Sequence, residues 1–315
     1  MSESIQDPQR ALLRLALLYL RPFVSAKTEP LPPDVLAQLK ASAEGGDAEA
    51  SYLLGLYYTF EESAQNLSTG LQWLRWAAEQ GSGDACLVLG DLYDSRRDGQ
   101  TIAAKDDATA FRYYKKAAQL GESECFYDVG LAYQHGIGTA KNPEHAAYWL
   151  QRAVAAGDEH AYGPLGLCYL EGDGVPLDVR KGEALLLKDP NQEKVRLTLG
   201  NIYAGVYGDD YADLEKAEQY YAPDLTDPAV KGIRYFALAY AASLCGAAGK
   251  EQYYLNQSAQ AGYEPAREAL REQAMSSGSQ STDGSDDDSA RSGGSKAGTV
   301  VLIFVVVVLA IIIFG

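Results

Sequence analysis

The chain has 315 residues, of which 43 are acidic and 27 basic, so its formal net charge at pH 7 is −16. This charge argues against general nucleic-acid binding, which needs a basic surface that displaces counterions. The sequence contains no CxxC pair, because its four cysteines are far apart, and zinc and redox motifs are therefore not predicted. The four are Cys86, Cys125, Cys168 and Cys245.

The first part of the chain carries a short apolar segment. Residues 11–20 are strongly apolar and end before Pro22. A signal peptide is the alternative interpretation, with cleavage after residues 24–26, but Arg14 interrupts the apolar core and acidic residues offset the basic start. We therefore expect residues 1–33 to form an N-terminal capping helix followed by a proline-rich loop.

A repeated pattern organises the middle of the chain. The pattern A-x-x-x-L-G-x-x-Y occurs six times with substitutions, and its central small residue lies at positions 55, 90, 130, 166, 200 and 237. Several copies are followed by a second pattern, an aromatic residue, two small residues and a glycine, beginning at Trp73, Tyr113, Trp149 and Tyr254. Repetition at 34 to 40 residues is typical of helical-hairpin solenoids, in which neighbouring hairpins bury each other's apolar faces.

The copy from Cys125 to Asp158 shows why each repeat is expected to be a hairpin. Gly130 lies beside an apolar helical stripe and lets a second helix approach closely. Asn142 is a favourable N-cap, Pro143 suits the first helical position, and Gly157 suits the helix end. Three of the four cysteines fall in first helices, where we expect them to be buried as small hydrophobic residues.

These patterns resemble the Sel-one-like (Sel1-like) repeat, a relative of the tetratricopeptide repeat. The resemblance covers residues 34–272 and implies protein-interaction roles. It predicts an all-α fold: a right-handed α/α solenoid of about six helical hairpins with helical caps, in a repeat domain over residues 34–274. Pro190, Pro223 and Pro228 depart from the pattern, so we expect irregular helices between residues 186 and 230.

The C-terminal part has the composition of a linker followed by a membrane anchor. Residues 275–297 are rich in Ser, Gly and Asp and are expected to be disordered. Residues 298–315 are predicted to form one C-terminal transmembrane helix, a tail anchor that contacts the lipid bilayer. Residues that represent this anchor are Val300, Phe304, Leu309 and Phe314.

Charge sets the predicted orientation of this single-pass anchor. Arg291 and Lys296 flank it on the N-terminal side, and the positive-inside rule then keeps the repeat domain cytoplasmic. A GPI-anchor signal is the alternative, but it requires a secretory signal and a longer polar spacer.

The sequence shows no catalytic motif. The three histidines, His135, His145 and His160, do not have metal-ligand spacing, and no P-loop, Rossmann glycine pattern or nucleophile elbow is present. We therefore predict no catalytic residue, no cofactor and no metal, and a protein that is not an enzyme.

A partner-binding surface is the better prospect. On each first helix, the positions three before, one after and four after the central small residue point away from the apolar stripe. We call the residues at these positions the first-helix row. We expect neighbouring helices to bury most of its apolar members. The members expected to stay exposed and bind a peptide or amphipathic helix are Tyr52, Asp91, Asp94, Tyr127 and Gln134.

The sequence thus favours a membrane-anchored adaptor or scaffold that presents a helical-repeat groove to a protein partner at the cytoplasmic face. The alternative is an exported or lumenal scaffold for envelope or quality-control machinery, with the repeats across the membrane. An enzyme is the least supported hypothesis.

Overall fold

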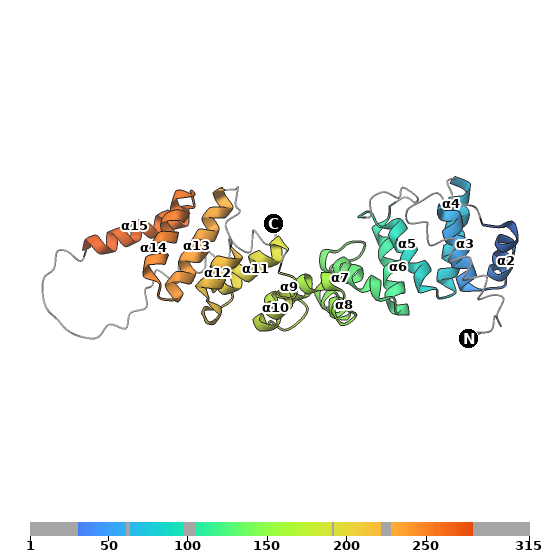
Figure 1. Cartoon of the computed structure of the whole chain (residues 1–315), viewed down its shortest axis with the longest axis horizontal. Coiled ribbons are helices and arrows are strands. Elements are labelled where there is room, and N and C mark those ends of the chain that lie inside the picture. The colour runs from blue at the N-terminus through green and yellow to red at the C-terminus, as the bar shows by residue number, and fades with distance from the viewer. Residues whose placement is uncertain (1–30, 61–63, 97–104, 191, 222–227, 280–315) are drawn as a thin grey trace, which may run out of the picture. The chain divides into compact units, whose positions relative to one another are not determined.

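The computed structural model describes residues 31–60, 64–96, 105–190, 192–221 and 228–279 (Figure 1). In these ranges every regular element is an α-helix or a short 3₁₀ helix, so the all-α prediction is confirmed for them. The helices divide into two compact units. The first ends at Cys168 and includes Gly172–Pro176, and the second comprises Tyr169–Glu171 and the chain from Leu177 onward.

The first unit is built from successive helical hairpins (Figure 1). Its helices are α2 (Pro33–Glu44), α3 (Ala48–Phe60), α4 (Ala64–Glu79), α5 (Gly83–Tyr93), α6 (Asp107–Leu120), α7 (Phe126–His135) and α8 (Pro143–Ala155), and α9 (Tyr162–Glu171) begins in it. Two single 3₁₀ turns, Ser123–Cys125 and Glu159–Ala161, precede α7 and α9. The pairs α3–α4, α5–α6 and α7–α8 correspond to the first three predicted hairpins.

Four second helices begin at an Asp or Asn cap, as the Cys125–Asp158 copy predicts. The Asn142 side chain accepts a hydrogen bond from the His145 amide at 2.9 Å, and Pro143 occupies the first helical position. Asp side chains cap α6, α10 and α12 in the same way, at Asp106, Asp178 and Asp213. The turn after α8 contains Gly157 at φ 89°, a conformation that favours glycine.

Close approach of the two helices at the central glycine is confirmed. A Cβ atom built on Gly130 would lie 2.9 Å from Leu150 Cγ, too near for any side chain. In each such pair the second-helix residue follows the aromatic position of the repeat. The pairs are Gly55 with Leu74, Gly90 with Tyr114, Gly130 with Leu150 and Gly200 with Tyr221.

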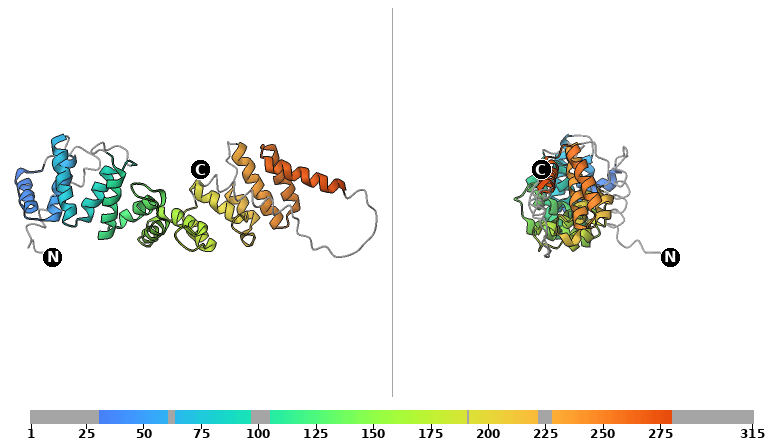
Figure 2. Two further views of the ribbon diagram at one scale, coloured as in Figure 1. Left: turned by 180° about the vertical axis from the view of Figure 1, so that it is seen from behind. Right: turned by 90° about the vertical axis from the view of Figure 1, so that its left-hand side faces the viewer.

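The second unit begins with short, less regular helices and ends with longer ones. They are α10 (Val179–Leu186), α11 (Glu193–Tyr203), α12 (Leu214–Tyr220), α13 (Pro228–Leu244), α14 (Ala248–Gln260) and α15 (Glu264–Ser279), with a 3₁₀ turn at Asp209–Tyr211. The predicted irregularity is confirmed in α10 and α12, which have 8 and 7 residues. Pro228, in contrast, interrupts no helix and begins α13, because proline is well tolerated at that position. Helices α13 and α14 lie side by side in both views (Figures 1 and 2).

The two ends of the chain lie outside the described residues. The capping helix predicted within residues 1–33 falls in residues 1–30, which are not described, and it and the tail anchor in residues 298–315 therefore stay predictions. In the described ranges, no helix combines the length and the apolar character needed to cross a membrane. Helix α15 continues to Ser279, so the start of the predicted linker, residues 275–279, is helical.

The cysteines follow the prediction made for the repeats. Cys86, Cys125 and Cys168 lie in or beside first helices and are buried, whereas Cys245 is exposed. Burial raises the pKa of the Cys86 thiol, although the nearby Lys116 charge opposes this effect.

Candidate partner-binding surfaces

Asp91 and Asp94, two of the predicted partner-binding residues, form hydrogen bonds inside the first unit. The Tyr114 hydroxyl donates to Asp91 Oδ1 at 2.7 Å and lies 3.2 Å from Asp94 Oδ2. Asp94 is only 1% exposed, so the expectation that it stays on the surface is wrong. The reason is the close approach at Gly90, which lets the Tyr114 ring cross the first helix and bring its hydroxyl to these carboxylates.

Arg96 completes this buried polar network. Its Nε and Nη2 atoms donate to the two oxygens of Asp94 at 3.0 and 2.7 Å, and Nη2 also lies 3.1 Å from Asp128 Oδ1. Burial opposes ionisation of Asp94, but the hydrogen bonds and charge of Arg96 overcome it and lower the pKa of Asp94 below its usual value. The network therefore links α5, α6 and α7.

Sequence contained a signal for this network that the repeat pattern alone does not reveal. In some copies a Tyr follows the aromatic position of the second helix. In those copies the residue that follows the central glycine of the first helix is polar, as in the pair Tyr114 and Asp91. Tyr221 follows the same rule and donates its hydroxyl to Asn201 Oδ1. Where the residue is Leu, as in Leu74 and Leu150, the partner positions hold Leu56 and Leu131. A buried tyrosine hydroxyl requires an acceptor, which explains the pairing.

The other predicted residues, Tyr52, Tyr127 and Gln134, are half-buried on α3 and α7. The Tyr127 ring lies 6.1 Å from the His160 ring, between centroids. Burial raises the pKa of Tyr127, and the charges of Asp128 and Asp158 add to the effect. These side chains are accessible enough to contact a partner.

An acidic cluster lies beside Tyr52. Burial raises the pKa of Tyr52 to about 12, with further contributions from the charges of Asp84, Glu124 and Glu122. Glu122 covers Gly83 at the start of α5, where a Cβ atom would overlap its carboxylate. The pKa of Glu122 is raised by burial and by the two neighbouring carboxylates. Helix α5 and the α6–α7 connection thus give the Tyr52 region a negative potential.

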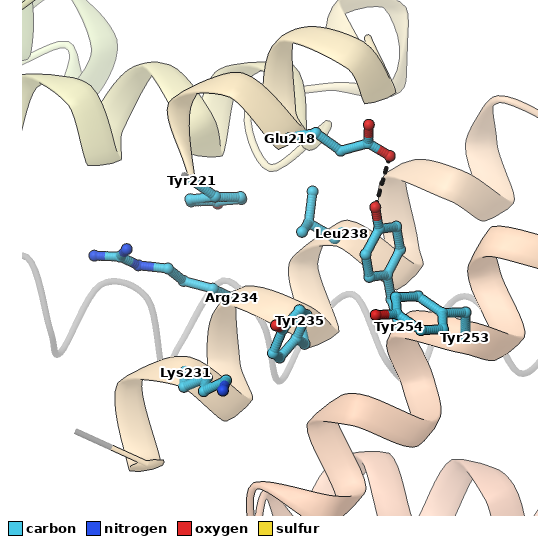
Figure 3. Close-up of a pocket in the computed structure, with 8 residues that line it drawn as sticks. All are labelled: Glu218, Tyr221, Lys231, Arg234, Tyr235, Leu238, Tyr253 and Tyr254. Atoms are coloured by element: carbon cyan, nitrogen blue, oxygen red, sulfur yellow. Dashed lines mark hydrogen bonds between the residues drawn. The ribbon is translucent and has the colours of Figure 1, made fainter. Parts of the chain in front are cut away.

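A pocket that the repeat analysis did not predict lies among α12, α13 and α14 of the second unit (Figure 3). It has a volume of about 240 Å³. Lys231, Arg234, Tyr235 and Leu238 line it from one face of α13, and Glu218, Tyr221, Tyr253 and Tyr254 line it from the neighbouring elements. Arg234 and Leu238 occupy, in the sixth repeat copy, the row positions three before and one after the central Ala237. Applying the same row positions to the sixth copy therefore identifies these two residues from sequence.

The charged side chains of this pocket differ in whether they have hydrogen-bond partners. Glu218 accepts hydrogen bonds from Lys250 Nζ and the Tyr254 hydroxyl, both at 2.7 Å. Arg234 is only 6% exposed, and its Nε atom meets no acceptor among the residues the structure describes. Burial lowers the pKa of Arg234, and the nearby Arg196 charge lowers it further. In the described ranges, no group of three or more His, Cys, Asp or Glu side chains is arranged to hold a metal ion.

Comparison with known proteins supports the predicted repeat type. The Sel1 repeat family model matches residues 48–82, 83–122, 124–158 and 161–188, the first four of the six predicted copies. The crystal structure of a protective antigen from uropathogenic Escherichia coli, described as displaying an SLR fold, is 21% identical with a TM-score of 0.50. The match covers 82% of this chain and 56% of that one, and it shows similarity of fold.

Curated relatives match a shorter part of the chain. A chitin synthase regulator of Malassezia restricta is 32% identical over 130 residues, which are 41% of this chain and 9% of the relative. A chitin synthase regulator of Saccharomyces cerevisiae is 27% identical over 128 residues, 40% of this chain and 18% of the relative. The chain therefore spans less than a fifth of the length of these two proteins.

Proposed function

We propose that the protein is a non-enzymatic adaptor that binds a protein partner through the first-helix row of its first unit, because four segments between residues 48 and 188 match the Sel1 repeat family model. The partner segment is basic and amphipathic. Its apolar side contacts the half-buried row residues Tyr52, Leu87 and Tyr127, and its basic side faces the carboxylates beside Tyr52.

The observation that carries this proposal is the acidic cluster next to a half-buried tyrosine. Burial raises the pKa of Tyr52, and the charges of Asp84, Glu124 and Glu122 lie near enough to raise it further. A partner with basic residues gains from such complementarity chiefly in association rate and specificity. The network of Asp91 and Asp94 supports the row from within, because these carboxylates are already engaged by Tyr114 and Arg96.

Site-specific photo-crosslinking in cells tests this surface. A photoreactive phenylalanine analogue replaces Tyr127 or Tyr52 in the full chain, and Tyr148, which is 52% exposed on the second helix α8, receives it as the control. We expect a discrete protein adduct from the Tyr52 and Tyr127 positions that is absent from the Tyr148 position. The double charge reversal Glu122→Lys/Glu124→Lys should reduce the adduct at least threefold. Equal adducts from all three positions, or none from Tyr52 and Tyr127, would refute the proposal.

The membrane part of the proposal rests on the sequence of residues 298–315. An apolar run of this length suits a single span, and a tail anchor would hold the repeats at the cytoplasmic face. Deleting Val300–Gly315 should move the protein from the membrane fraction to the soluble fraction, whereas continued membrane attachment would contradict the anchor. In sealed membrane vesicles with the cytoplasmic face outward, protease protection of the repeats that is lost when the membrane is opened would instead favour the exported scaffold.

A narrower candidate function is regulation of a membrane enzyme that makes a surface polysaccharide. The similarity to chitin synthase regulators over 128 to 130 residues favours it. The adduct from Tyr127 would then contain a polysaccharide synthase, which mass spectrometry identifies directly.

A further inference from the structure

The second unit contains a buried positive charge without a counterion among the described residues. Arg234 extends beside the Tyr221 ring, on the side of the pocket opposite Tyr253 and Tyr254 (Figure 3). The residue is only 6% exposed, and its Nε atom has no acceptor in the described ranges. Burying an arginine without a partner is costly, because the guanidinium loses water and gains nothing in return.

A second arginine increases the positive potential at this place. Arg196 of α11 lies close enough to disfavour the charge on Arg234, and its own Nε atom is also buried without an acceptor in the described residues. The nearby carboxylates do not satisfy Arg234. Glu218 is already held by Lys250 and Tyr254, and Glu193 acts on Arg234 only as a nearby charge, with no ion pair between them.

The size and walls of the pocket restrict what fits. A volume of about 240 Å³ lies below the range of roughly 300–1,000 Å³ that holds drug-sized ligands, and it suits one or two side chains. The rings of Tyr235 and Tyr254, which stack with centroids 6.1 Å apart, offer an aromatic wall. Because Glu218 lines the same pocket, a monoanion fits better than the dianion of a phosphate group.

We propose that this pocket binds the carboxylate of a peptide, carried on an acidic side chain or at the chain end, with Arg234 as the residue that binds the carboxylate. An apolar or aromatic neighbour in the peptide then packs against the tyrosine wall. The site lies in the second unit and does not depend on the surface proposed for the first.

Nuclear magnetic resonance of arginine Nε–Hε groups in the full chain, in detergent, tests this site with four probes. These are N-acetyl-Phe-Glu-amide, N-acetyl-phenylalanine, neutral N-acetyl-Phe-Gln-amide and inorganic phosphate. We expect one or both carboxylate probes to shift the Arg234 Nε–Hε resonance and to bind at least tenfold more tightly than the neutral probe. The probe with the tighter binding identifies the source of the carboxylate.

Two variants separate the site from its surroundings. Arg234→Lys keeps the charge but loses the planar fork, and it should lose at least 80% of the preference for the carboxylate probes. Arg267→Lys, at an exposed pair with Glu264 on α15, is the matched control and should keep that preference. Thermal melting of both variants verifies that they remain folded.

Three results would overturn the proposal. One is equal affinity for the Glu and Gln probes, and a second is tighter binding of phosphate than of either carboxylate probe. The third concerns Asp224 and Asp227, which follow α12 in sequence and lie outside the described residues. If carboxylate probes bind only after Asp224→Asn/Asp227→Asn, the chain itself fills the site and no partner peptide does.

Discussion

Replacing Gly90 by alanine tests the close helix approach on which the repeat depends. A Cβ atom at this position would lie 2.6 Å from both Tyr114 Cδ1 and Cε1 and 3.0 Å from Cγ. Ordinary carbon–carbon contacts are about 3.5–4.0 Å, so the ring must move by about 1 Å. Tyr114 is 2% exposed, and its hydroxyl is fixed by Asp91 and Asp94, which leaves it little room to move.

The expected free-energy change combines two opposing terms. Overpacking of a well-packed core costs about 1–3 kcal/mol. Replacing glycine by alanine within a helix recovers about 1 kcal/mol. The difference is about 0–2 kcal/mol. Because Tyr114 has little room to move, we expect Gly90→Ala to destabilise the first unit by an amount in the upper half of this range.

Gly249→Ala is the matched control for this substitution. Gly249 is also helical, in α14, and a Cβ atom there would have no neighbour within 4 Å. This variant should be unchanged or stabilised by about 0.5 kcal/mol.

Hydrogen exchange measured by mass spectrometry locates the effect, because repeat proteins open locally rather than in one transition. Gly90→Ala should lower the protection of peptides from α5 and α6 and leave those from α13 and α14 unchanged. Wild-type protection in α5 would refute the close-packing argument, and equal loss in both units would show that the effect is not local.

Further predictions concern the buried network and the cysteines. Tyr114→Phe should lower stability by about 1–2 kcal/mol in urea unfolding, because the half-buried Asp91 and the buried Asp94 lose a hydrogen-bond donor. The depressed pKa of Asp94 contributes stability that is present above its unfolded pKa of about 3.9 and is lost as pH falls through its folded pKa. Arg96→Met should therefore reduce stability more at pH 7 than at pH 2.5, and an equal loss at both would contradict the assignment. Alkylation of the native protein should modify Cys245 first, and the buried thiols only after unfolding: Cys86, Cys125 and Cys168.

Local sequence was sufficient to predict the helical hairpins. Caps such as Asn142, turn glycines such as Gly157 and the small residue at Gly130 act through neighbouring backbone and side chains, so their meaning can be read from spacing. The short helices α10 and α12 could be predicted for the same reason, because a proline ends a helix through its effect on the local backbone, independently of the rest of the chain.

Only the tertiary structure decided which polar side chains stay free. Asp94 occupies a position predicted to face a partner, yet it is buried, because the Tyr114 hydroxyl reaches it from α6 and Arg96 binds it from the turn two residues later. Arg234 occupies the same row in the sixth copy, and its Nε atom lacks an acceptor among the described residues. The contact between Tyr114 and Asp94 joins side chains 20 residues apart on two helices, and the spacing of residues along one helix does not describe such a contact. Only the pairing of Tyr with a polar residue between the two helices of a copy signals it.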